Sequence, residues 1–256
     1  MKLLRPLLLA CSLLIAATAH AERITVAAAA DLKFAMDEMV TTFKQANPTD
    51  QVEVIYGSSG KFHTQIQQGA PYDLYFSADI AFPRELAKAG FAASEVKPYA
   101  FGRIVLWSAS MDATKMTMGS LTDPKVTRIA IANPKHAPYG KRAEEALKAS
   151  GLWEKVEPKL VYGENIAHAV QFVQTGNAQV GIVALSLATN PELSRRGGYW
   201  LIPDKLHEPL EQGFVITKRA EGNALARRFA DYISSKPARA VMTKYGFLLP
   251  GDVAGK

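Results

Sequence analysis

Residues 24–69, ITVAAAADLKFAMDEMVTTFKQANPTDQVEVIYGSSGKFHTQIQQG, contain two strand–turn–helix units in succession. In the first unit, a strand beginning with Ile24-Thr25-Val26 runs into the small-residue turn of Ala27 to Ala30, and residues 32–46 then carry apolar side chains at helical spacing as far as Asn47-Pro48. The second unit has a strand over 52–56, the turn Gly57-Ser58-Ser59-Gly60 and a helix over 61–68. Strands that alternate with helices predict right-handed βαβ units and a mostly parallel sheet.

The same alternation continues to the end of the chain. Further strands are predicted over residues 73–76, 103–108, 128–132, 180–185 and 214–217. Further helices are predicted over residues 81–88, 139–149 and 165–175, with two more between 221 and 245. Neither an internal repeat nor a low-complexity linker separates these blocks. The fold class that follows is α/β.

The first 21 residues have the plan of a secretory signal peptide. Lys2 and Arg5 precede an apolar run over residues 7–19, and Ala19-His20-Ala21 forms an A-x-A cleavage site. A membrane-spanning helix would need about 18 or more apolar residues, which this run does not reach. A lipoprotein signal acylated at Cys11 would leave an apolar stretch of only a few residues. We therefore expect export to the periplasm, with cleavage after Ala21.

Composition narrows the possible functions further. Cys11 is the only cysteine and leaves with the leader, so the exported chain must be held by its core without disulfides. The leader also carries two of the basic residues behind the formal net charge of +6, which leaves +4. These basic residues are scattered, and no basic stripe is interleaved with aromatic residues, so nucleic-acid binding is not expected. A mild positive field would steer an anionic ligand.

Four turns open predicted helices with small or polar residues. They are Ala28-Ala29-Ala30-Asp31, Gly57-Ser58-Ser59-Gly60, Ala137-Pro138-Tyr139-Gly140 and Gly163-Glu164-Asn165-Ile166. In an open α/β sheet, ligands bind beyond the carboxyl ends of the strands, where helix N-termini offer free N–H groups. Ser58 and Ser59 would add hydroxyl donors. The same residues are also ordinary caps and turn formers, so the residues alone indicate a small anion and no more.

Signatures of catalysis are weak by comparison. His63, His136, His168 and His207 lack metal-ligand spacing, and no G-x-S-x-G elbow or complete P-loop is present. A periplasmic hydrolase would have to use Asp31, Asp79 or His136, for which the sequence offers no spaced nucleophile–base pair. A transcription-factor effector domain would need a DNA-binding module, where this chain has an export signal. We therefore expect a binding protein, not an enzyme, with no cofactor.

Nearly the whole chain, from ITVAAA at 24–29 to YGF at 245–247, resembles the periplasmic molybdate-binding proteins of bacterial ABC importers. The most specific segments are GSSG at 57–60, GAPYDLYFSAD at 69–79, NPKHAPYG at 133–140 and VGIV at 180–183. The resemblance implies a type II periplasmic-binding-protein-like fold, in which two lobes joined by two hinge crossovers close on a tetrahedral dianion. We expect lobe 1 to span about 22–100 plus 207–256, and lobe 2 to span 101–206.

The resemblance also implies which residues hold the anion. Ser59 would use its hydroxyl and N–H with Ser58 beside it, Tyr139 and Ile166 would use their backbone N–H groups, the first turn would supply Ala30 and Asp31, and Lys61 and Asn165 would support the site. The ligand would be molybdate or tungstate, without any direct bond from protein to metal. The expected partners are an inner-membrane ABC permease and its ATPase, and the chain is expected to be a monomer. The alternative is a receptor for another oxyanion, such as sulfate or a phosphonate.

Two positions depart from the best-known pattern of this family. Asp31 stands where a neutral hydroxyl or amide residue is usual, and Ala184 stands where some members have a tyrosine donor. A desolvated carboxylate would repel a dianion, so Asp31 must point away, cap its helix or pair with a cation. Lys61 follows the second turn directly. Either the two side chains form an ion pair, or Asp31 caps its helix while Lys61 lies in solvent.

Overall fold

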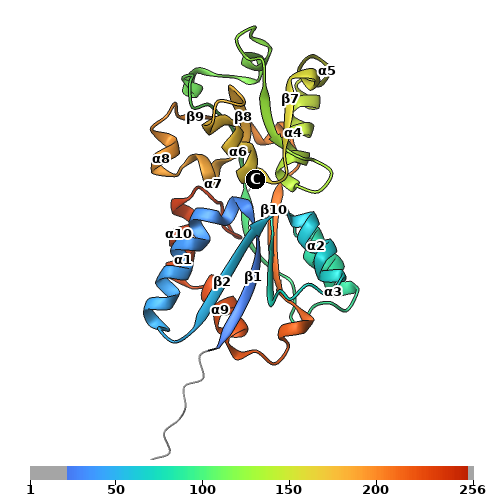
Figure 1. Ribbon diagram of the computed structural model, residues 1–256, viewed down its shortest axis with the longest axis vertical. Coiled ribbons are helices and arrows are strands. Elements are labelled where there is room, and N and C mark those ends of the chain that lie inside the picture. The colour runs from blue at the N-terminus through green and yellow to red at the C-terminus, as the bar shows by residue number, and fades with distance from the viewer. Residues whose placement is uncertain (1–21, 253–256) are drawn as a thin grey trace, which may run out of the picture.

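The computed structural model describes residues 22–252, which form two α/β lobes, one above the other in Figure 1. Each lobe is built on one five-stranded sheet. The signal peptide predicted over residues 1–21 lies outside the described residues. Among residues 22–252, no helix is long and apolar enough to cross a membrane.

The first sheet has one reversed strand. Its order is β2 (Gln51–Gly57), β1 (Arg23–Ala29), β3 (Leu74–Ser77), β10 (Leu210–Ile216) and β4 (Lys97–Gly102). β1 is parallel to β2 and β3, whereas β10 is antiparallel to both of its neighbours. Four strands therefore run in one direction, which confirms the mostly parallel sheet. β10 begins four residues before the predicted start at Phe214.

The second sheet repeats this plan. Its order is β7 (Leu160–Gly163), β6 (Ile129–Ala132), β8 (Val180–Ala184), β5 (Ile104–Trp107) and β9 (Tyr199–Leu201). β6 is parallel to β7 and β8, and β5 is antiparallel to β8 and β9. The reversed strand of each sheet is the one that follows a passage of the chain between the sheets, β5 after the first passage and β10 after the second. The carboxyl ends of the remaining strands in each sheet therefore share an edge.

Helices cover both faces of the first sheet because its strands alternate between two cores. Val26, Phe76 and Phe214 pack in one core, and Ala27 and Tyr75 pack in the other. The first core is covered by α1 (Lys33–Ala46), α9 (Ala224–Ile233) and α10 (Lys236–Lys244), and the second by α2 (Ser59–Gln67) and α3 (Ala81–Lys88) (Figure 1). A short 3-10 helix, η1 (Ala30–Leu32), precedes α1.

The second lobe has one continuous core, which also includes Ala29, Ala30 and Ala78 of the first lobe. Its helices are α4 (Pro138–Ala149), α5 (Trp153–Val156), α6 (Ile166–Gln174), α7 (Leu185–Ala188) and α8 (Pro191–Ser194). The remaining 3-10 helices are η2 (Ala113–Lys115), η3 (Met118–Thr122), η4 (Glu157–Lys159), η5 (Asp204–Leu206) and η6 (Lys218–Ala220). Because alanines from one lobe are buried in the core of the other, the two lobes are in contact.

The chain passes between the sheets twice. It leaves the first sheet between Gly102 and Ile104, and it returns between Leu201 and Leu210. The lobe boundaries expected near residues 100 and 207 stay a prediction. The two passages lie beside the interface between the lobes, and the helix starts at 30, 59, 138 and 166 lie at that interface.

Candidate functional site

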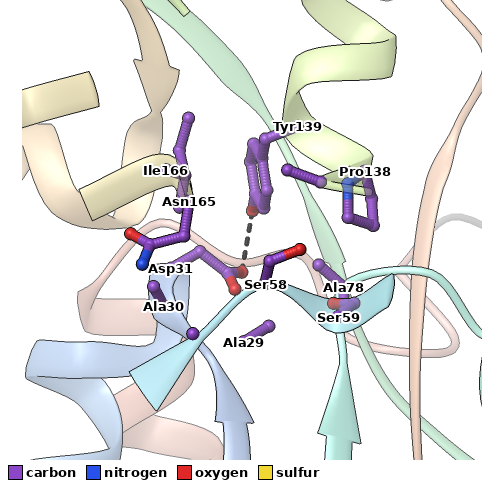
Figure 2. A pocket seen from close by; sticks show the side chains of 12 residues that line it. Ala29, Ala30, Asp31, Ser58, Ser59, Ala78, Pro138, Tyr139, Asn165 and Ile166 are labelled. Carbon is purple, nitrogen blue, oxygen red and sulfur yellow. Dashed lines mark hydrogen bonds between the residues drawn. The ribbon is translucent and has the colours of Figure 1, made fainter. Parts of the chain in front are cut away.

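A small cavity lies between the lobes where four helices begin. Its volume is about 10 Å³, close to the smallest that holds one water molecule. The residues that line it are Ala29, Ala30, Asp31, Gly57, Ser58, Ser59, Ala78, Ala137, Pro138, Tyr139, Asn165 and Ile166. Figure 2 shows the first lobe below the cavity and α4 and α6 of the second lobe above it. The lining includes every predicted ligand-binding residue.

Ser59 opens α2 with its hydroxyl held in one position. The helix starts two residues earlier than the predicted residue 61, so Ser59 is its first residue and Ser58 its N-cap. Ser59 is buried, and its Oγ accepts a hydrogen bond from the Ala78 backbone N–H at 3.0 Å. Tyr75 Oη fixes the same turn by donating to the Ser59 carbonyl at 2.7 Å. The Ser59 oxygen is thus engaged as an acceptor, while its hydroxyl proton stays free for a ligand.

Backbone N–H groups of the second lobe line the other side of the cavity. Tyr139 is the second residue of α4, after Pro138, and Ile166 is the first residue of α6. Such positions have no hydrogen-bond partner within their own helix and lie at its positive dipole end. Asn165 caps α6, because its side chain accepts from the His168 N–H at 3.0 Å. The cap leaves the Ile166 N–H available to the cavity.

Asp31 is buried at the centre of a polar cluster that joins the lobes. Its Oδ2 accepts hydrogen bonds from Tyr139 Oη at 2.9 Å and from Gln212 Nε2 at 2.8 Å. Gln212 Nε2 also donates to Tyr139 Oη at 3.0 Å, and Ser186 Oγ donates to the Asp31 carbonyl at 2.8 Å. Burial raises the pKa of Asp31 to about 7, although the hydrogen bonds from Gln212 and Tyr139 lower it. Asp31 therefore changes between its neutral and its ionised form within the physiological pH range.

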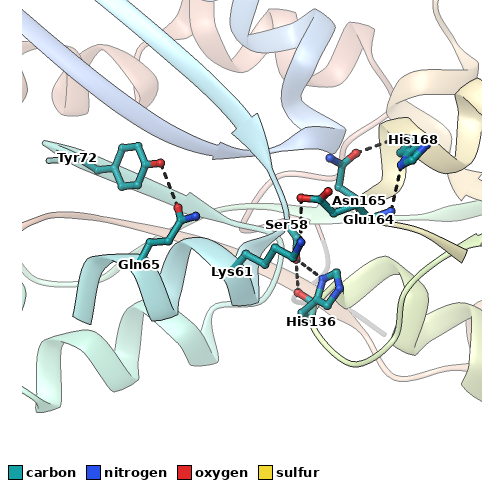
Figure 3. A network of polar contacts seen from close by, with 8 residues as sticks. All are labelled: Ser58, Lys61, Gln65, Tyr72, His136, Glu164, Asn165 and His168. Atoms are coloured by element: carbon teal, nitrogen blue, oxygen red, sulfur yellow. Dashed lines mark hydrogen bonds and ion pairs between the residues drawn. The ribbon is translucent and has the colours of Figure 1, made fainter. Parts of the chain in front are cut away.

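Neither of the two alternatives for Asp31 and Lys61 is correct: the two side chains do not form an ion pair, the Asp31 side chain caps neither η1 nor α1, and Lys61 has another partner. Lys61 Nζ lies 3.0 Å from Glu164 Oε1, on the loop before α6, and both side chains are about half exposed (Figure 3). The carboxyl group of Asp31 accepts hydrogen bonds from two neutral donors, and no cation pairs with it among the described residues. The reason is that Lys61, on the first turn of α2, extends across the mouth of the cleft, whereas Asp31 is buried beneath it. Lys61 thus links the two lobes without entering the cavity.

Ser58 and His136 form a second link between the lobes. Ser58 Oγ lies 2.9 Å from His136 Nδ1 and also donates to the His136 carbonyl, and the Gly60 N–H donates to that carbonyl at 2.9 Å (Figure 3). Sequence reasoning found no such serine–histidine pair. The hydroxyl proton of Ser58 goes to the carbonyl oxygen, so Nδ1 does not receive it as a base would. Burial lowers the pKa of His136, and the charge of Lys61 lowers it further.

Sequence reasoning missed Gln212, Ser186 and the hydroxyl of Tyr139. Gln212 lies in the apolar strand β10, and a buried amide in such a strand was the one available signal. Gly102 leaves the room that the cluster needs, because a Cβ there would lie 2.3 Å from Tyr139 Oη. Within residues 22–252, no three or more His, Cys, Asp or Glu side chains gather as a metal site. The polar groups that line the cavity are hydrogen-bond donors and the carboxyl group of Asp31.

Two lobes with a donor-lined cavity between them define a ligand-capturing protein and not a structural one. The family model of the bacterial extracellular solute-binding proteins matches residues 24–248. The chain belongs to this family.

Within it, the chain is similar to proteins named for molybdate. It is 38% identical to the molybdate-binding protein ModA of Rhodobacter capsulatus over 198 residues, 77% of each chain. It is 37% identical to ModA of Azotobacter vinelandii over 235 residues, 91% of this chain and 93% of that protein.

Solved structures show the same arrangement. The periplasmic molybdate-binding protein of Azotobacter vinelandii superposes with a TM-score of 0.84 at 31% identity, covering 89% of this chain and 99% of the other. The sulfate-binding protein SubI of Mycobacterium tuberculosis superposes with a TM-score of 0.72 at 16% identity, covering 88% of this chain and 86% of the other. The second likeness is one of fold alone. The predicted fold class is thereby confirmed.

Proposed function

We propose that this protein captures molybdate, or tungstate, between its lobes and delivers the anion to an ABC importer. The observation that carries the proposal is the convergence of four helix starts, one of them with the free hydroxyl of Ser59, on a single small cavity. Helix N-termini favour anions because their free N–H groups and dipoles point at the ligand. The relatives at 37% and 38% identity are named for molybdate.

In this proposal the two lobes hold different oxygens of the ion. Ser59 donates through its hydroxyl and N–H from the first lobe, beside Ala30 of the first turn. Tyr139 and Ile166 donate their backbone N–H groups from the second lobe. Ser58 completes the lining of the cavity on this side and forms a hydrogen bond with His136 across the cleft. No residue bonds to the metal directly, and no cofactor takes part.

Size, not charge, would select the ligand. Molybdate, tungstate and sulfate are all tetrahedral dianions, so charge does not separate them. Donors fixed at helix starts suit one oxygen spacing, and packed helices do not shift to suit a smaller ion. The alternative receptor, for sulfate or a phosphonate, would require a different spacing of the same donors.

The role would be transport without catalysis. An exported monomer in the periplasm, released by cleavage after Ala21, would carry the anion to an inner-membrane permease and its ATPase. A hydrolase would need the Ser58 hydroxyl to give its proton to His136 Nδ1, and the carbonyl of His136 competes for that proton.

Calorimetry of residues 22–256 tests the proposal. Molybdate and tungstate should each bind at one site with similar affinity, and sulfate at comparable concentration should not displace them. A protein that binds sulfate or a phosphonate as well as molybdate would contradict the assignment. Binding of none of these anions would contradict the proposed class of ligand.

A further inference from the structure

The two carboxyl oxygens of Asp31 have different surroundings. Oδ2 accepts both side-chain hydrogen bonds, from Tyr139 Oη and Gln212 Nε2. Oδ1 is buried and has no hydrogen-bond partner in the described part of the chain. Asp31 itself is 1% exposed and lines the cavity (Figure 2). Oδ2 is thus held by two side-chain donors, whereas Oδ1 has no hydrogen bond of normal geometry, although the backbone N–H groups of Asp31 and Leu32 lie near enough to the carboxyl group to lower its pKa.

This asymmetry matches a neutral carboxylic acid and not a carboxylate. In a neutral acid, the carbonyl oxygen accepts hydrogen bonds, and the other oxygen carries a proton that needs an acceptor. In a carboxylate, Oδ1 would be a buried negative atom without a donor, beside a cavity proposed to hold a dianion. The elevated pKa of Asp31 agrees with the neutral form. An anion in the cavity would supply the acceptor that Oδ1 lacks.

We propose that Asp31 binds the oxyanion as a neutral acid, donating a hydrogen bond from Oδ1, so that the protein takes up one proton when the dianion binds above neutral pH. The inference rests on the proposed function. The proton comes from solvent and stays on Asp31 while the anion is bound. As a neutral acid, Asp31 favours a fully ionised oxyanion over one whose own O–H would need an acceptor there.

Other ionisable groups lie on the elements around Asp31. They are Lys33 of α1, Tyr56 of β2, Lys61 of α2, Tyr99 of β4, His136 before α4, Tyr139 of α4, Glu164 before α6 and His168 of α6. Burial raises the pKa of all three tyrosines, so they stay neutral near pH 8. The pKa of His136 and the pKa of Glu164 are both lowered. Neither group therefore takes up a proton near pH 8.

The experiment is calorimetric titration of residues 22–256 with sodium molybdate at pH 8, in buffers that differ in ionisation enthalpy. The dependence of the heat on the buffer gives the number of protons taken up. We expect close to one proton per molybdate in the wild type and close to none in Asp31→Asn, whose amide donates without titrating. His168→Gln should keep the wild-type uptake, as a control for a histidine near the cleft.

A second readout is the affinity against pH. Between pH 7 and 9, the molybdate affinity of the wild type should fall by up to about tenfold per pH unit, whereas that of Asp31→Asn should stay flat. Molybdate binding without proton uptake in the wild type, or uptake that persists in Asp31→Asn, would overturn the inference and leave the proposed function standing. A wild type that does not bind molybdate at all would overturn both.

Discussion

The two lobes meet at Gly60, where the backbone of the opposite lobe leaves no room for a side chain. The Gly60 N–H donates to the His136 carbonyl across the cleft at 2.9 Å, and a Cβ at residue 60 would lie 2.8 Å from that oxygen and 3.1 Å from His136 Cα. Both atoms belong to the backbone, so they cannot rotate away. Gly60→Ala should therefore hold the lobes apart or force the loop at 136 to move.

The size of the effect follows from two contributions. Overpacking a fitted contact costs about 1–3 kcal/mol, and the hydrogen bond at Gly60 contributes about 0.5–1.5 kcal/mol when it is lost. Together they weaken molybdate binding by about 1.5–4.5 kcal/mol, which corresponds to roughly 10-fold to 2000-fold. Alanine also favours helix over glycine by about 1 kcal/mol, so the variant should fold at least as well as the wild type.

Calorimetry with molybdate measures this loss, and thermal melting checks the fold. Gly222→Ala is the matched control, because a Cβ there meets nothing within 4 Å. It should bind as the wild type does. A Gly60→Ala protein with wild-type affinity would refute the reasoning that binding requires the lobes to meet at this contact.

The remaining predictions concern the hydroxyl of Ser59, the ion pair between Lys61 and Glu164, and the buried carboxyl group of Asp31. Ser59→Ala should weaken molybdate binding by about tenfold or more, since a hydrogen bond to a charged partner contributes about 1.5–3 kcal/mol; unchanged affinity in a folded variant would remove Ser59 from the site. Lys61→Ala should change the affinity by no more than about fivefold, because an exposed ion pair contributes about 0–1 kcal/mol, and a double-mutant cycle with Glu164→Ala, not with Asp31→Asn, should show the coupling. The pKa of Asp31 is raised from 3.8 to about 7, so the ligand-free wild type should lose stability relative to Asp31→Asn as the pH rises from about 4 to 7, by at most about 4 kcal/mol. Thermal melts at several pH values check this, and a difference that does not grow with pH would contradict it.

Much of the fold could be predicted from periodicity and turn residues. The helices at 81–88 and 139–149 were predicted to within one residue at each end, because Gly90 and Pro138 mark their limits. The strands β4, β7 and β9 were missed. β9 is only three residues long and two of them are exposed, so the apolar alternation that announces a strand is absent.

The residues that line the cavity were predicted better than the partners of its charged side chains. The four turns were recognised because a helix start is a local feature, visible as a turn before an apolar periodic segment, whereas Ser59, Tyr139 and Ile166 within them were predicted from the family resemblance. The partners of Asp31 and Lys61 were not predicted, since Gln212 and Glu164 are more than 100 residues away in the chain and only the folded lobes bring them together. A local pattern locates a donor, but the partner of a charge depends on the tertiary structure.

The central claim is that the cavity between the four helix starts holds the oxyanion. Anomalous diffraction at the molybdenum absorption edge, from crystals of residues 22–256 grown with molybdate, locates the metal atom directly. We expect one strong peak in the cavity lined by Asp31, Ser59, Tyr139 and Ile166, with oxygen atoms between the metal and every protein group. A peak elsewhere, or a protein side chain bonded directly to molybdenum, would contradict the account.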